Sequence, residues 1–275
     1  MALEPVHHVI NPVREIWFWI ILALFAGSVL AVGLGYSHPS DTTFWIILMA
    51  LILAFVGYLG YCTMGTWEGI IINERNLMSL SRMQITAWTI LIVSALMVMV
   101  AVRVAANVPD ALNIEINQEI WAVLGLSAFA AVGTPMINNA KSIKEPAPDT
   151  KDPSNTPVTR AATLLNENAA DIEEHRHGVL YANNTPDEAR FTDIFEGDEL
   201  ANTMYIDITK VQMFWLSLIA LAGYAFLLLN LFLTATPDTL TKFPAFSDGY
   251  LAILAVSHAT YLGGKTITQT KSTGS

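Results

Sequence analysis

Residues 85–106 read ITAWTILIVSALMVMVAVRVAA, a run of 22 residues in which Arg103 is the single charged side chain. A helix needs about 20 mostly apolar residues to cross a bilayer, so this run predicts a transmembrane helix. Five more segments have the same character, at 16–36, 44–64, 120–137, 211–234 and 250–264. The expected fold is therefore an all-α, polytopic membrane bundle of about six transmembrane helices.

The composition also indicates that a bilayer is the main solvent. Of the 275 residues, 53% are hydrophobic and 14% are charged, whereas soluble domains carry roughly 25% charged residues. The net charge of −10 lies mostly in residues 141–208, which hold 14 acidic and six basic residues. Because no basic stripe is available to neutralise phosphates, we expect no nucleic-acid partner.

The basic residues predict the orientation of these helices. With six spans and an inside N-terminus, 12 of the 14 Lys and Arg residues fall in inside segments, and only Arg103 and Lys242 lie toward the outside. Cytoplasmic loops carry such an excess. We therefore expect the N-terminus and the C-terminus to face the inside of a prokaryotic inner (cytoplasmic) membrane. The regions are then a two-helix membrane region with its cytoplasmic loop (1–78), a membrane hairpin (79–140), an acidic cytoplasmic loop (141–206), and a second hairpin with a tail (207–275).

The acidic loop is the one sizeable polar segment. It begins with a proline-rich stretch, and residues 159–174 have the composition of a polar helix. Phe191, Ile194 and Phe195 then lie at helical spacing, which predicts an amphipathic helix at the membrane interface. Two interpretations remain open for the loop: a solvated acidic segment, or a docking surface for a cytoplasmic protein partner made by these three apolar side chains.

The two hairpins resemble one another in sequence. The segment 80–84 (LSRMQ) matches 208–212 (ITKVQ) in residue type, 128 positions later, and Pro-Asp at 109–110 recurs at 237–238. After a two-residue shift, Ser127 pairs with Ser257. Both copies start and end on the same side, so we expect parallel helical-hairpin repeats related by an axis along the membrane normal.

Polar residues in these repeats are candidates for holding the bundle together. Gln84 and Gln212 lie one turn inside their helices, where an unpaired amide is costly, so we expect them to bond across helices. Arg82 and Lys210 are expected at the inner headgroup level. The smaller helix-packing candidates are Ser127, Ser257 and His258; lining a polar passage is the alternative role.

The same segments carry a family resemblance. The stretch LSRMQITAW (80–88) and the block FPAFSDGYLAILAVSHATYLGGK (243–265) are similar to a family of uncharacterised prokaryotic integral membrane proteins with a duplicated two-helix hairpin. The family tends to have Gly where Ala255 stands here. The resemblance covers about half of the chain and implies the duplicated topology; it implies no activity.

The sequence has no pattern typical of an active site. A haem bundle needs paired His ligands, but His258 is the one histidine inside a predicted span; His175 and His177 lie in the charged loop. The sequence has no phosphate-binding loop, nucleophile elbow or zinc-protease motif. We therefore expect no catalytic residues, no cofactor and no metal.

Three functions remain open. The first is a non-enzymatic structural or anchoring subunit that holds a cytoplasmic assembly at the membrane. The second is an oligomeric ion channel or pore, in which Ser127, Ser257 and His258 would face water around an axis between copies. The third is an accessory subunit of a membrane enzyme complex. Each has the lipid bilayer as a partner, and the second requires a homo-oligomer.

Overall fold

The structure is a computed structural model that describes residues 16, 18–23, 25–27, 42–148 and 154–272. All of its regular elements are helices. The long ones are α2 (Thr42–Met64), α3 (Leu80–Ala105), α4 (Gln118–Ser142), α7 (Ile208–Thr234) and α8 (Asp248–Thr266). Between α4 and α7 lie the short helices α5 (Pro157–Leu165), α6 (Ala169–His175), η1 (Pro186–Glu188) and η2 (Phe191–Ile194).

Four of these helices, α2, α3, α4 and α7, are long and apolar enough to cross a membrane, which agrees with a membrane protein. The segment expected at 250–264 forms α8, a helix of 19 residues that is less apolar than those four. The segment expected at 16–36 lies mostly outside the described residues. Of its described part, Phe18 and Phe25 place their rings against Phe55 of α2.

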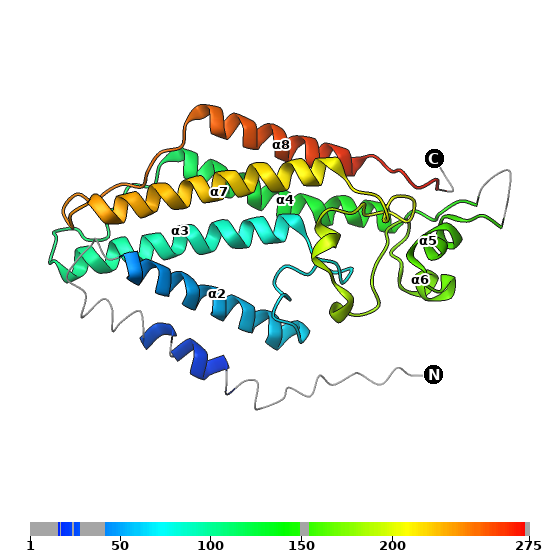
Figure 1. Cartoon of the computed structure of the whole chain (residues 1–275), viewed down its shortest axis with the longest axis horizontal. Coiled ribbons are helices and arrows are strands. Elements are labelled where there is room, and N and C mark those ends of the chain that lie inside the picture. Colours follow the sequence, from blue (N-terminus) through cyan, green and yellow to red (C-terminus); the bar gives the residue numbers. More distant parts are fainter. Residues whose placement is uncertain (1–15, 17, 24, 28–41, 149–153, 273–275) are drawn as a thin grey trace.

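The long helices lie side by side (Figure 1). α3 packs against α4 and α7, and α8 also packs against α4 and α7, so these four close a ring, while α2 lies outside it against α3 and α7. The main core fills the ring with apolar side chains. At its centre the Tyr224 and Phe246 rings stack 4.6 Å apart, and Trp88 contacts both.

The helix ends extend beyond the apolar runs. α3 begins at Leu80 rather than at 85, because Ser81 and Gln84 in its first turn are buried against the bundle. Asp207 caps α7 by accepting from the backbone N–H of Thr209, and Ser247 caps α8 by accepting from that of Tyr250. Such caps satisfy the free N–H groups of a first helical turn.

Residues 143–148 and 154–207 form a folded unit, here named the loop module, at the end of the bundle where α4 and α8 finish; we call this the loop end (Figure 1). The polar helix expected at 159–174 is two helices, because Asn166 adopts a left-handed conformation (φ 57°) that ends α5. The two pack over a small core that includes Ala161, Ile172 and Tyr181. The amphipathic helix expected from 191 is wrong, since the helix stops after one 3-10 turn at Ile194.

A substitution at one close contact between backbone segments would test this packing. α2 passes the turn after it at Gly60 and Gly69, where a Cβ built on Gly60 would lie 2.9 Å from the Gly69 nitrogen. We expect Gly60→Ala to lower the free energy of unfolding by about 1–3 kcal/mol, because backbone must move. Gly223→Ala is the matched control, since its Cβ meets nothing within 4 Å. Thermal unfolding in detergent measures both; equal stability would contradict the contact.

Candidate functional site

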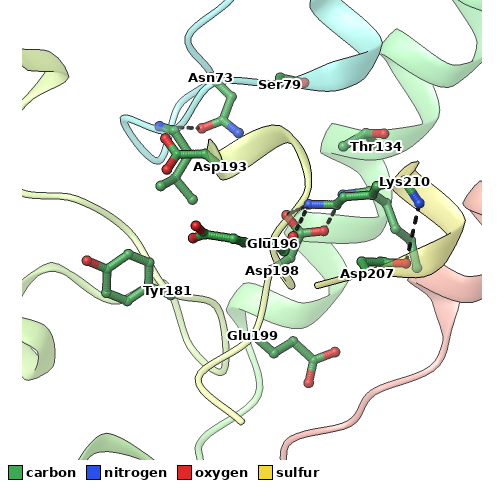
Figure 2. A network of polar contacts seen from close by, with 12 residues as sticks. Asn73, Ser79, Thr134, Tyr181, Asp193, Glu196, Asp198, Glu199, Asp207 and Lys210 are labelled. Carbon is green, nitrogen blue, oxygen red and sulfur yellow. Dashed lines mark hydrogen bonds and ion pairs between the residues drawn. The ribbon is translucent and has the colours of Figure 1, made fainter. Parts of the chain in front are cut away.

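The most concentrated polar arrangement in the described chain surrounds two neighbouring acids of the loop module, Asp198 and Glu199. Three cations from three different segments converge on the Asp198 carboxylate. Arg75 comes from the turn between α2 and α3, Lys210 from the first turn of α7, and Lys265 from the last turn of α8. Figure 2 shows the Lys210 side chain directed toward Asp198 and Glu196. We name this group the Asp198 cluster.

The Asp198 contacts are short and buried. Arg75 Nη2 donates to Oδ1 at 2.6 Å, Lys265 Nζ to Oδ2 at 2.5 Å, and Lys210 Nζ to Oδ1 at 3.3 Å. The three cationic side chains are 1–6% exposed. Arg75 Nη1 also donates to the carbonyl oxygens of Tyr181 and Asp198, and Lys210 Nζ donates to that of Glu196. The cluster therefore fixes the position of the loop backbone as well as its carboxylate.

Glu199 makes the second connection. Its Oε1 accepts from Lys141 Nζ in the last turn of α4 at 2.6 Å. Its Oε2 accepts from the backbone N–H groups of Gln269 and Thr270, just after α8. Lys141 Nζ donates also to the Ile267 carbonyl at 2.8 Å. The side chains of Lys141 and Glu199 are 7% and 2% exposed, so this pair too is inside the protein.

The pKa of Asp198 responds to this environment. Burial alone would raise the pKa of this carboxyl, but the charges of Lys210, Lys265 and Arg75 outweigh that effect and hold it well below its ordinary value. Asp193, in the same loop, differs: burial raises its pKa, although it accepts from the backbone N–H groups of Arg190 and Met78. Asp198 is thus an anion at neutral pH, and its charge serves to hold the three cations.

The structure gives each predicted polar residue a definite place. Gln84 is buried on α3 and donates to Ser217 Oγ of α7 at 2.7 Å, an interhelical bond of the expected kind. Gln212 is exposed, so the two glutamines do not share an environment. Arg82 donates to the Ile72 carbonyl and is partly exposed. Lys210 does not reach outward to headgroups, because the Asp198 cluster binds it.

The other predicted residues divide into buried and exposed ones. Ser127, Ser257 and His258 are 1–4% exposed within the single chain, on α4 and α8. Of the proposed docking residues, Ile194 is 1% exposed in a core cluster at the loop end, and the Phe195 ring packs 5.0 Å from that of Phe214 of α7. Only Phe191 remains substantially exposed, at 53%. Two members of that expected surface therefore attach the loop module to the bundle instead.

The Asp198 cluster was not predicted from the sequence. Its signal was present, since Arg75, Lys141, Lys210 and Lys265 all lie beside the loop-end termini of long helices. The positions of these basic residues predict the membrane orientation, but they do not identify the acids that pair with them. Within the described residues, no group of three or more His, Cys, Asp or Glu side chains could hold a metal ion. The arrangement is suited to joining segments.

Comparisons of the chain with protein-family models, curated proteins and solved structures found no match. Function is therefore inferred from the geometry of this chain.

The Asp198 cluster predicts an asymmetry between its members, because three cations share one carboxylate. Asp198→Asn leaves those cations without a counter-charge, and we expect the free energy of unfolding to fall by about 3–5 kcal/mol. Lys265→Met leaves two cations on Asp198 and should cost much less. Glu74→Gln, which breaks an exposed pair with Arg82, is the control and should cost about 1 kcal/mol at most. Chemical denaturation in detergent measures all three; equal losses at Asp198 and Lys265 would contradict the cluster.

The low pKa of Asp198 also predicts a pH dependence. A carboxyl with a lowered folded pKa stabilises the fold fully above its unfolded pKa of about 3.9, and that contribution is lost as pH falls through the folded value. We expect the loop module to stay attached at about pH 4 and to loosen as pH falls further. Pepsin cleavage within 154–207 measures this. An identical pH profile in Asp198→Asn would refute the assignment, because that variant lacks the titrating group.

Proposed function

We propose that this chain is a non-enzymatic anchoring subunit, which holds a protein partner at the inner side of a prokaryotic cytoplasmic membrane. One observation carries the proposal: the loop module is a folded unit bound to the loop-end termini of α4, α7 and α8 by buried ion pairs. A partner bound to such a module is held rigidly to the membrane helices. A free loop would let it move independently.

The outer face of the loop module supplies the chemistry for a partner. Its exposed acids lie on α6, at Asp171, Glu173 and Glu174, and on the turn that carries Asp187 and Glu188. Glu173 also pairs with Arg176 on this surface, whereas Asp198 and Glu199 are buried with their cations. An acidic face attracts a basic partner from a distance, and an exposed apolar side chain beside it, Phe191, adds affinity on contact. We therefore propose a partner with a basic surface.

The basic residues at the loop end also predict how the protein is oriented in the membrane. The cations that bind the loop module are among the residues expected inside, and the segments at the opposite end contribute only Arg103 and Lys242. An excess of basic residues marks cytoplasmic loops. We propose that the loop end, and with it the N-terminus and C-terminus, faces the cytoplasm.

We also propose that α3–α4 and α7–α8 are parallel repeats, with α2 and the preceding span as additions. The closed ring supports this, because exchanging α3 with α7 and α4 with α8 returns the same set of helix neighbours. The different burial of Gln84 and Gln212 limits the symmetry to the backbone. The symmetry of the ring is also interrupted on one side, where α2 packs against α3 and α7.

The pore alternative has less support than the anchor. It requires Ser127, Ser257 and His258 to face an axis between copies, whereas these side chains are buried between helices of one chain. α4 instead presents bulky apolar side chains to its surroundings, including Phe129, Val132 and Met136. Such a face suits acyl chains better than water.

Removing charge from the outer acidic face tests the anchor. In the triple variant Asp171→Asn, Glu173→Gln, Glu174→Gln, we expect co-purification of the partner from native membranes to fall about tenfold and to lose its salt dependence, as for interfacial charges. The control carries the same charge change at the opposite end: Asp110→Asn, Glu115→Gln, Asp238→Asn. Quantitative mass spectrometry of the purified complexes compares the two. Loss of the partner only in the control variant, or equal recovery in both, would overturn the proposal.

A further inference from the structure

The helix faces that α4 and α8 bury carry polar side chains at nearly every turn over their loop-end halves. Membrane helix interfaces contain small residues and occasional polar ones, so such a series requires a separate explanation. The buried members on α4 are Ser127, Thr134, Asn138 and Lys141, and those on α8 are Ser257, His258, Tyr261 and Lys265. We name these two facing rows the α4–α8 seam.

The two rows are in register. α4 and α8 run in the same direction, since both end at the loop end (Figure 1). Thr134 Oγ1 lies 3.4 Å from Tyr261 Oη, and Lys141 Nζ donates to the Ile267 carbonyl one level nearer the loop end. At 1.5 Å per residue, Ser127 lies about 10 Å deeper than Thr134.

His258 and Ser257 lie about 4.5 and 6 Å deeper than Tyr261 along α8, so they lie between the levels of Thr134 and Ser127. The Nδ1 atom of His258 lies 2.9 Å from the Leu254 carbonyl oxygen. This bond places the proton on Nδ1 and leaves Nε2 as an acceptor. The deep half of the seam therefore contains two hydroxyls, of Ser127 and Ser257, and one imidazole.

Four polar atoms in the seam have no hydrogen-bond partner among the residues that the structure describes. They are Ser127 Oγ, Asn138 Nδ2, Ser257 Oγ and His258 Nε2. An unsatisfied buried polar group destabilises a fold, and hydrocarbon offers no compensation. The four atoms include donors and acceptors; Asn138 lies nearest the loop end, and those of Ser257, His258 and Ser127 lie deeper. Bound water satisfies such groups in folded proteins, with two to four polar partners per molecule.

The two ends of the seam differ. At the loop end, Asn138 and Arg75 line a half-open hollow of about 220 Å³ beside Ser142 and His177. Beyond Ser127, the same faces become apolar, with Ile120 and Val123 on α4 and Leu254 on α8 buried in the main core. Water can therefore enter from one side only.

We propose that the α4–α8 seam binds a file of water molecules that enters at the loop-end hollow and ends at the deep polar atoms of His258, Ser257 and Ser127. The seam is an aqueous inlet, closed toward the opposite end by the apolar core. It gives a buried imidazole in the membrane region contact with the solvent of one compartment. This property does not depend on the proposed anchoring function, because it concerns the faces that α4 and α8 bury against each other and not the outer face of the loop module.

Cysteine accessibility tests the inlet, and Cys62→Ser gives a cysteine-free background. Ser257→Cys reports on the seam, and Val256→Cys is the matched control, because Val256 is its neighbour on the lipid-facing side with 63% exposure. Silver ions are added to sealed vesicles of either orientation, and the unreacted thiol is then counted with a maleimide after denaturation. We expect reaction at 257 from the loop-end side to be at least about tenfold faster than at 256, since a thiolate forms in water and not in hydrocarbon.

Two outcomes of the labelling overturn the proposal. Equally slow reaction at 257 and 256 means a dry seam, and fast reaction at 257 from both sides means a continuous passage rather than a closed inlet. Water-edited solid-state NMR of the unaltered protein gives a second decision where a cysteine variant does not fold. Magnetisation should pass from water to Ser127, Ser257 and His258 faster than to Val132 and Val256. Equal transfer to both sets overturns the inlet.

Discussion

The attraction between one carboxylate and three cations determines how this molecule is assembled. Arg75, Lys210 and Lys265 belong to segments that are far apart in the sequence, and each is removed from water where the chain meets Asp198. A buried cation is costly without a counter-charge. These three can therefore adopt their positions only when the loop module places Asp198 among them. The membrane helices and the module thus depend on each other for their relative arrangement.

At the opposite end of the bundle, a buried cation is stabilised by backbone carbonyl groups instead of an acid. Arg103 of α3 is 3% exposed, and its guanidinium donates to the carbonyl oxygens of Asp110, Ala111 and Leu240. The first two belong to the α3–α4 turn and the third to the α7–α8 connection, so this side chain joins the two hairpins. Carbonyl dipoles are weaker partners than a carboxylate, but five N–H donors can be shared among several of them. The two hairpins are therefore fastened at both ends, by ion pairs at one and by a capped arginine at the other.

The sequence was sufficient to predict the four long helices α2, α3, α4 and α7, because each contains an apolar run of about the length that a bilayer requires. The helix ends were less accurate, since hydropathy stops at the first polar residue, whereas in α3 Ser81 is buried and Gln84 bonds to Ser217 inside the bundle. The Asp198 cluster could not be predicted, because its ion pairs join residues up to 123 positions apart and the basic residues alone resembled headgroup anchors. The docking surface predicted at Ile194 and Phe195 failed for a similar reason. An apolar side chain in an acidic loop can bind a partner or pack against its own protein, and the sequence alone does not distinguish the two.

A wet seam and a closed bundle are compatible in this fold. The hollow at the loop end is lined by residues of both charges, Glu74 and Arg75, beside Asn138. Toward the opposite end, Ile120, Val123 and Leu254 are buried in the main core. A file of water needs polar partners along its whole path, so the apolar side chains end it. A bundle that admits water from one side can therefore still act as a closed, non-conducting anchor.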